Sequence, residues 1–186
     1  MAWLSHQSEV PGAVIFGCAG PELTADETAL FRRVNPLGFI LFAKNCETPE
    51  QVTRLVAALR DTVGRADAPV LIDQEGGSVR RLHPPQWDEV PPAAVFGTIY
   101  AQDPTRAGEA AKLSGSLIAA QLAPLGITVN CAPVLDVSFP ETTRAIGDRA
   151  FAADPAVVAE LAGMFCEGMV AGGVLPVIKH IPGHGR

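Results

Sequence analysis

The chain has 186 residues, 48% of them hydrophobic, and its 14 Lys and Arg against 20 Asp and Glu give a formal net charge of -6. This length and apolar content can bury the core of one domain and exclude a disordered tail. Nucleic acids and anionic membranes need clustered positive charge, so the acidic balance and the lack of a Lys/Arg run argue against both. The expected partner is a small molecule or another protein.

The opening stretch and the cysteines favour a reducing compartment. The first twenty residues show neither the basic nor the apolar region of a signal peptide, and no apolar stretch reaches the ~20 residues of a membrane span. The cysteines are widely spaced without a CxxC pair, which predicts buried free thiols: Cys18, Cys46, Cys131 and Cys166. We therefore expect a soluble, cytoplasmic protein.

Five short apolar runs predict β-strands. They lie at 13–18, 38–42, 69–72, 127–135 and 173–178. Their apolarity is nearly continuous rather than alternating, as is typical of parallel strands that are covered on both faces.

The segments between these runs are predicted to be mostly helical. Helices are expected over 24–33, from Thr48 onward, and over 105–122 and 156–171. Their capping residues are Thr24, Thr48, Asp103 and Asp154. Glu27 and Gln51 stand where a capping box places its second residue. In the helix over 105–122, the spacing predicts that Leu113, Leu117, Ile118 and Leu122 face the core. The stretch 76–98, with its four prolines, is expected to be an irregular, functional loop.

This alternation of strands and helices implies a parallel sheet, either doubly wound or part of a (β/α)8 barrel. A doubly wound sheet predicts a Gly-rich turn after the first strand, which the sequence lacks. A barrel predicts polar residues directly after the strands, and the sequence has them. A complete barrel needs eight strands, so we expect an incomplete barrel with about the first five.

The first stretch whose side chains could bind or act on a ligand is L-I-D-Q-E-G-G-S-V-R-R, over 71–81. Asp73 ends a strand and could project into a pocket, because Gly76 and the glycine after it allow a tight turn. A loop-capping role fits Asp73 equally well. Glu75 is interpreted as tying down the loop, and Arg81 alone would be a surface charge.

A second stretch comprises C-A-P-V-L-D-V over 131–137 and R-A-I-G-D-R-A-F over 144–151. Asp136 ends a strand and could be catalytic, but a structural ion pair with Arg144 or Arg149 is the favoured interpretation. Arg149 is well placed to donate hydrogen bonds to an oxygen-rich ligand.

The third stretch is K-H-I-P-G-H-G-R, at 179–186. His180 and His184 have the spacing of a helical zinc pair, but Pro182 and the glycine after it forbid a regular helix, so no metal site is expected. Lys179 could form a Schiff base or simply donate hydrogen bonds to substrate hydroxyls. The residues alone leave both possibilities open.

Five motifs, GFILFAKN, IDQEGGSVRRL, NCAPVLDV, AIGDRAF and KHIPGHG, occur together in one order and spacing. In these motifs the chain resembles the family 3 glycoside hydrolases, and most closely their bacterial β-N-acetylglucosaminidase branch, which is associated with cell-wall recycling. The resemblance covers about the first half of the catalytic barrel. Residues 1–186 are therefore expected to be the N-terminal portion of that domain.

The resemblance implies removal of terminal N-acetylglucosamine with retention of configuration, without metal or cofactor. By position, Asp73 and Arg81 match a sugar-binding pair, Arg149 matches the arginine of a G-[DE]-R segment, and Lys179 with His180 matches a pair that also grips sugar hydroxyls. Ser78 and Ile181 depart from the family pattern, which often has Arg and Phe there. Neither departure falls on a predicted ligand position.

The resemblance also implies that the catalytic groups follow the GHG motif. In this branch the general acid/base is a His on a mobile loop and the nucleophile is an Asp after a later strand, both beyond Arg186. We therefore expect no glycosidase activity from this chain alone, and possible association through its open barrel edges. Three alternatives are another family 3 glycosidase such as a β-glucosidase, a Schiff-base lyase, and a non-catalytic sugar-binding module.

Overall fold

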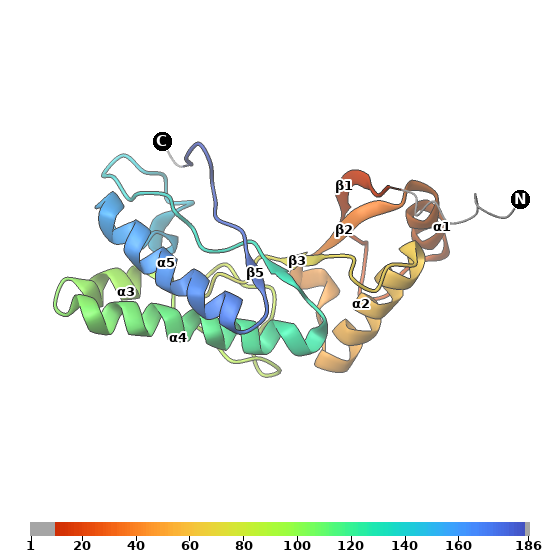
Figure 1. Ribbon diagram of the computed structural model, residues 1–186, viewed down its shortest axis with the longest axis horizontal. Coiled ribbons are helices and arrows are strands. Elements are labelled where there is room, and N and C mark those ends of the chain that lie inside the picture. Colours follow the sequence, from red (N-terminus) through yellow and green to blue (C-terminus); the bar gives the residue numbers. More distant parts are fainter. Residues whose placement is uncertain (1–9, 185–186) are drawn as a thin grey trace, which may run out of the picture.

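The structure is a computed structural model that describes residues 10–184. Residues 1–9 and 185–186 lie outside it. The first range holds nine of the twenty residues without a signal-peptide pattern, and the second ends the K-H-I-P-G-H-G-R stretch. Five parallel strands form one sheet in the order β1-β2-β3-β4-β5 (Figure 1). They are β1 (Gly12–Phe16), β2 (Pro36–Leu41), β3 (Val70–Ile72), β4 (Val129–Asn130) and β5 (Leu175–Pro176).

This strand order decides between the two predicted architectures. A doubly wound sheet reverses its strand order at a switch point, whereas a barrel adds strands one after another in sequence. The sequential order is that of a barrel. The predicted α/β fold, an incomplete barrel of five strands, is confirmed.

The strands lie where the apolar runs predicted them, but the fourth is much shorter than the predicted 127–135. β4 ends at Asn130 because the N–H of Ala132 turns back to the C=O of Asn130 at 2.9 Å, and Pro133 has no N–H to donate to the ladder. Beyond the proline the chain pairs with the segment after β5 again, through a bridge between Val134 and Lys179.

Helices connect consecutive strands. They are α1 (Ala25–Val34), α2 (Pro49–Val63), α3 (Ala93–Tyr100), α4 (Pro104–Leu122) and α5 (Pro155–Ala171), with 3-10 turns η1 (Ala43–Asn45), η2 (Ala123–Leu125) and η3 (Gly147–Arg149). Each of the four predicted N-caps accepts a backbone hydrogen bond: Thr24, Thr48, Asp103 and Asp154. Glu27 completes its capping box. Gln51 instead accepts from the N–H of Glu47.

Helix α3 was not predicted. It begins inside the stretch expected to be irregular, directly after Pro92. Pro92 is the N-cap residue and offers no side-chain hydrogen bond to the first turn, so the sequence carried no capping signal for this helix.

The prediction for the face of α4 was half wrong. Ile118 and Leu122 are fully buried, but Leu113 and Leu117 are 59% and 51% exposed. The reason is that α4 packs against α5 through its small residues. A Cβ at Gly115 would overlap the backbone of Phe165, so the two helices lie too close for leucines between them. Figure 1 shows α4 and α5 side by side.

The predicted free thiols are confirmed, although only Cys18 is fully buried and the other three cysteines are partly exposed. Burial raises the pKa of Cys18 to about 11 and that of Cys46 to about 12. Both therefore remain protonated at neutral pH.

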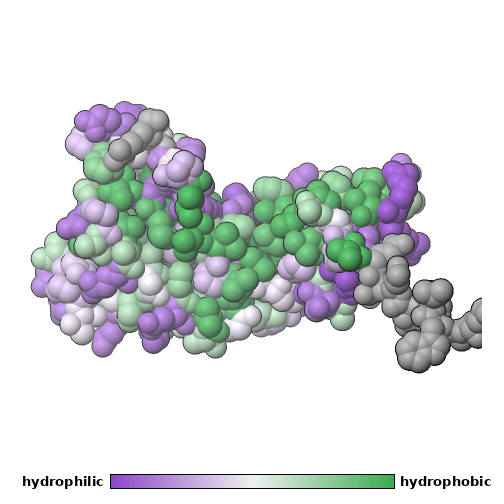
Figure 2. All heavy atoms as spheres, turned by 45° about the horizontal axis from the view of Figure 1, so that its top comes forward, coloured by the Kyte–Doolittle hydropathy of each residue, from purple (hydrophilic) through white to green (hydrophobic). Residues whose placement is uncertain are grey.

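The two edge strands β1 and β5, and the segment after β5, expose large apolar side chains. These include Ile15, Leu175, Val177 and Ile178. Figure 2 shows apolar residues gathered along the middle of one face of the molecule. Within residues 10–184, no helix combines the length and apolar character needed to cross a bilayer.

Candidate functional site

The predicted polar residues meet at one edge of the sheet. Asp73 follows β3, Asp136 lies in the segment after β4, and Lys179 and His180 lie after β5. Because the strands are parallel, their carboxyl ends share this edge, and the connecting loops fold over it. Arg149 joins them from η3, at the end of the long loop between β4 and α5.

Asp73 is held between two cations. Its Oδ1 accepts a hydrogen bond from Lys179 Nζ at 3.0 Å, and its Oδ2 accepts from Arg81 Nη2 at 3.2 Å. The guanidinium of Arg81 also lies 5.9 Å from the centroid of the Phe42 ring. These contacts join the ends of β2, β3 and β5.

Glu75 links the same lysine to Arg149. Its Oε1 lies 2.5 Å from Lys179 Nζ, and its two oxygens accept from Arg149 Nη2 and Nε at 2.8 Å each. The Glu75 side chain is only 6% exposed. Glu75 therefore does more than tie down its own loop, because it connects two cations that come from other loops.

These five side chains form one chain of alternating charge, which we call the ion-pair chain: Arg81, Asp73, Lys179, Glu75 and Arg149. Burial opposes ionisation of Asp73, but the hydrogen bond and charge of Lys179, with Arg81, outweigh it and hold the pKa of the Asp73 carboxyl below its usual value. The hydrogen bonds from Arg149 to Glu75 raise the pKa of the Arg149 guanidinium above its usual value.

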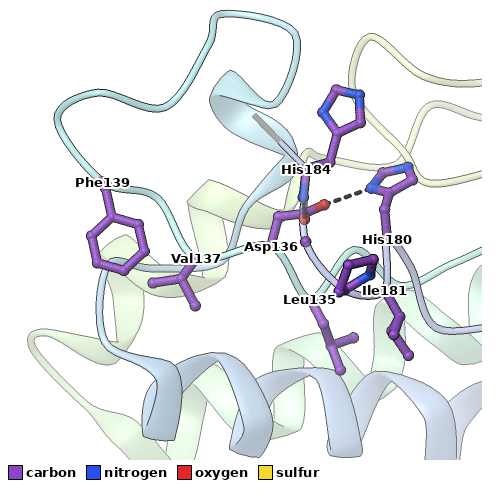
Figure 3. A pocket seen from close by; sticks show the side chains of 9 residues that line it. Leu135, Asp136, Val137, Phe139, His180, Ile181 and His184 are labelled. Carbon is purple, nitrogen blue, oxygen red and sulfur yellow. Dashed lines mark hydrogen bonds and ion pairs between the residues drawn. The ribbon is translucent and has the colours of Figure 1, made fainter. Parts of the chain in front are cut away.

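His180 extends the ion-pair chain to a third carboxylate, that of Asp136. Its Nε2 lies 3.5 Å from Arg149 Nη2, and its Nδ1 lies 2.5 Å from Asp136 Oδ2 (Figure 3). The other oxygen of Asp136 accepts from the backbone N–H of His184 at 2.6 Å. The predicted pairing of Asp136 with Arg144 or Arg149 was wrong, because the loop after β5 brings His180 to the carboxylate instead.

A pocket of about 390 Å³ opens beside this His-Asp pair. Its lining combines apolar and polar residues: Leu135, Asp136, Val137, Phe139, His180, Ile181, Pro182, Gly183 and His184. Figure 3 shows the Asp136 carboxylate pointing toward the His180 ring, with Phe139 on the far side. The volume lies in the range of small-molecule sites.

The geometry bears on the two possibilities left open for Lys179. Lys179 Nζ donates to Asp73 and lies 2.5 Å from Glu75, so both contacts use it as a hydrogen-bond donor, whereas a Schiff base would have to replace them. The arrangement favours a hydrogen-bond donor. In the part of the chain that the structure describes, no cluster of three or more His, Cys, Asp or Glu is arranged to hold a metal ion.

Sequence reasoning missed two buried amides behind the ion-pair chain, Gln74 and Asn130. Gln74 is 2% exposed and Asn130 is fully buried. The available signal was Asn130 itself, a polar residue inside an otherwise apolar predicted strand. A buried polar side chain needs hydrogen-bond partners, so such a residue indicates a side-chain hydrogen bond inside the protein.

The strand order and the site define a class, the barrel-type α/β domains whose ligand site lies at the carboxyl edge of the sheet. The chain belongs to glycosyl hydrolase family 3: residues 19–186 match the N-terminal domain of that family.

Curated relatives support the same assignment. The beta-hexosaminidase of Stenotrophomonas maltophilia strain R551-3 is 38% identical over 172 residues, which cover 92% of this chain and 50% of the relative. That of Xylella fastidiosa strain M23 is 38% identical over 174 residues, with the same coverage. The chain spans about half the length of the curated relatives it matches.

Solved structures agree. NagZ from Neisseria gonorrhoeae, in complex with N-trifluoroacetyl-D-glucosamine, has a TM-score of 0.88 at 32% identity, covering 94% of this chain and 51% of that one. A family 3 beta-N-acetylglucosaminidase from Paenibacillus sp. str. FPU-7 has a TM-score of 0.84 at 32% identity, covering 98% of this chain and 34% of that one.

Proposed function

We propose that this chain supplies the sugar-binding part of a retaining β-N-acetylglucosaminidase. The complete enzyme would remove terminal, non-reducing β-N-acetylglucosamine from peptidoglycan-derived saccharides, in the cytoplasm and as part of cell-wall recycling. Asp73, Arg81, Arg149, Lys179 and His180 would bind the sugar. Two relatives support this choice, because one is a beta-N-acetylglucosaminidase and the other binds a glucosamine derivative.

The observation that carries the proposal is the ion-pair chain. A sugar hydroxyl both donates and accepts hydrogen bonds, so it can insert between a carboxylate and a cation and satisfy both. Asp73 and Lys179 present such a pair at the strand ends, with their side chains 18% and 14% exposed. Their charges compensate each other before a ligand arrives, and charged partners strengthen each hydrogen bond to it.

His180 offers a different contact. Nδ1 of His180 faces Asp136, so Nε2, next to Arg149, is the ring nitrogen that remains for a ligand. In the tautomer in which Nδ1 carries the proton, Nε2 is an acceptor. A hydroxyl placed at this nitrogen could donate to His180. Hydrogen bonds of this kind that strengthen as the sugar ring distorts would lower the barrier to glycosidic bond cleavage.

The bond-breaking groups would come from elsewhere in the complete protein. Retaining hydrolysis needs a nucleophile near the anomeric carbon and a separate proton donor. Asp73, Glu75 and Asp136 are already occupied by cations or N–H donors. The proposal therefore predicts binding without turnover for residues 1–186.

The test is a titration of the chain with N-acetylglucosamine, followed by NMR or calorimetry, alongside an assay with a chromogenic β-N-acetylglucosaminide. We expect saturable binding that Lys179→Met abolishes and no hydrolysis above the blank. Lys112→Met is the matched control, because Lys112 of α4 forms an exposed ion pair with Glu167 of α5 and contacts no member of the ion-pair chain. Absence of saturable binding would refute the sugar-binding role. Turnover would refute the claim that residues 1–186 lack the bond-breaking groups.

This titration does not separate the two glycosidase alternatives, because the hydroxyl-binding residues do not report the 2-acetamido group and a β-glucosidase would use the same contacts. An assay of the complete protein on a matched pair of substrates separates them. Faster hydrolysis of the β-N-acetylglucosaminide than of the β-glucoside supports the proposal. Equal rates would favour the broader family assignment.

A further inference from the structure

The side chain of Asn130 holds the chain where β3 ends. Its Oδ1 accepts from the N–H of Gln74 at 2.9 Å, and its Nδ2 donates to the C=O of Gln74 at 2.9 Å. The backbone ladder between β3 and β4 pairs Ile72 with Asn130 and then stops. The Asn130 amide thus replaces the backbone partner that β4 no longer provides.

The side chain of Gln74 repeats this arrangement one step further on. Its Oε1 accepts from the N–H of Arg81 at 2.8 Å and from that of Leu82 at 3.1 Å, and its Nε2 donates to the C=O of Leu82 at 3.3 Å. The loop between is closed by its own bridge, in which Glu75 N–H donates to the C=O of Val79 at 2.9 Å. Gln74 therefore spans the base of this loop.

Neither amide is placed to touch a ligand. Both are buried, and every polar atom of both has at least one partner in the protein. Unsatisfied buried amides are costly, so these contacts are strongly favoured over alternatives. The two amides fix the backbone beside the ion pair. Asn130 holds Gln74, which directly follows Asp73, and the Gln74 side chain holds the backbone N–H of Arg81.

We propose that Asn130 and Gln74 are positioning residues, which set the backbone on both sides of the Asp73–Arg81 pair so that the two side chains meet at the sugar. The inference rests on the proposed sugar-binding function. Arg81 has a long, flexible side chain, and fixing its backbone reduces the conformational entropy that ligand binding must overcome. Outer partners of this kind preorganise a site without contacting the ligand.

The chain offers a matched control for the test. Gln51 is also a buried glutamine, 7% exposed, whose amide makes three backbone hydrogen bonds, to Glu47, Pro21 and Asn45. These contacts hold the loops after β1 and β2 rather than the Asp73–Arg81 pair. Gln74→Met and Gln51→Met remove comparable contacts, so a purely structural effect would be similar in both.

The experiment measures N-acetylglucosamine affinity and the pKa of Asp73, the latter from its carboxyl carbon chemical shift. Gln74→Met should weaken affinity about tenfold, which is typical when a residue that holds a binding side chain in place is removed. It should also raise the pKa of Asp73 toward 3.8, as its cations lose their fixed place. Gln51→Met should change affinity by about twofold or less, because the Gln51 amide contacts neither Asp73 nor Arg81.

A double variant tests the route of the effect. If Gln74 acts through Arg81, then Gln74→Met should weaken affinity by about twofold or less in an Arg81→Met background, because coupled residues are not additive. Full additivity, or equal effects of Gln74→Met and Gln51→Met, would overturn the proposal. If Gln74→Met does not fold, Gln74→Asn keeps a buried amide that is too short to reach Arg81 and serves for the same measurements.

Failure of the inference is distinguishable from failure of the proposed function. If the unmodified chain binds no sugar, the proposed function fails, but the pKa of Asp73 still reports positioning. An Asp73 pKa that is unchanged by Gln74→Met would then refute the positioning role by itself.

Discussion

The contact between α4 and α5 and the ion-pair chain are both central to this molecule, but different forces hold them. The helices meet through glycines: a methyl group added at Gly168 would overlap the carbonyl of Lys112. The ion-pair chain joins its loops through charge, and its side chains keep some access to solvent. Steric fit therefore holds the helix contact together, and electrostatic attraction holds the ion-pair chain together. Stability and ligand binding should respond to different substitutions.

The largest change in the free energy of unfolding is expected at the contact between α4 and α5, which depends on steric fit. Gly168→Ala adds one methyl group in the middle of α5. Helix propensity alone would stabilise this variant by ~1 kcal/mol. Overpacking against the Lys112 carbonyl should outweigh that gain and lower the free energy of unfolding by about 2 to 3 kcal/mol. Urea denaturation measures the change.

Gly163→Ala is the matched control on the same helix. A Cβ at Gly163 has no atom within 4 Å, so this variant should gain up to ~1 kcal/mol. If both variants were stabilised, the two helices would be packed more loosely than the approach of Gly168 to the Lys112 carbonyl implies. If Gly168→Ala also altered the pKa of Asp73, the two regions would not be independent.

The second effect concerns the ion-pair chain. Lys179→Met leaves the carboxylates of Asp73 and Glu75 with one cation fewer. Removing one partner from a fully buried ion pair costs about 3 to 5 kcal/mol, but here Arg81 and Arg149 remain, so we expect about 2 kcal/mol. Lys112→Met, which breaks an exposed pair, should cost about 0 to 1 kcal/mol. Equal losses would show that burial adds nothing at the strand ends.

The two regions also differ in what could be predicted from sequence. Helix starts were predictable because capping is local: Thr24 and its partner Glu27 are three residues apart. The clustering of Asp73, Lys179 and Arg149 followed from the rule that parallel strands share one carboxyl edge. Both arguments need only the order of elements along the chain.

Other features depended on packing that no local pattern encodes. The spacing of leucines in α4 matched a helical face, yet the partner helix requires glycines there, so Leu113 and Leu117 face outward. The partner of Asp136 was missed because Arg144 and Arg149 lie nearer in sequence, although His180 follows the neighbouring strand β5 and so reaches the same edge. Gln74 gave no periodic signal, since its role depends on where the backbone of Arg81 returns.

A third, smaller effect is pH-dependent. The pKa of Asp73 is lowered in the folded protein, so its contribution to stability is present above the unfolded pKa and is lost as the pH falls through the folded value. Stability should therefore fall as the pH decreases below about 3.8, more steeply in the unmodified chain than in Asp73→Asn. Urea denaturation at a series of pH values compares the two. Parallel curves would contradict ionic stabilisation of Asp73.

The smallest effect should come from the outer face of α4. Leu117 is 51% exposed although it lies in the helix that packs most closely on α5. Leu117→Gln should therefore change the free energy of unfolding by less than about 0.5 kcal/mol, as is usual for surface positions. Ile118→Ala, at a fully buried neighbouring position, should cost about 2 to 5 kcal/mol and is the positive control. A large loss of unfolding free energy in Leu117→Gln would mean that both faces of α4 are closely packed. The contrast between its inner and outer sides would then not hold.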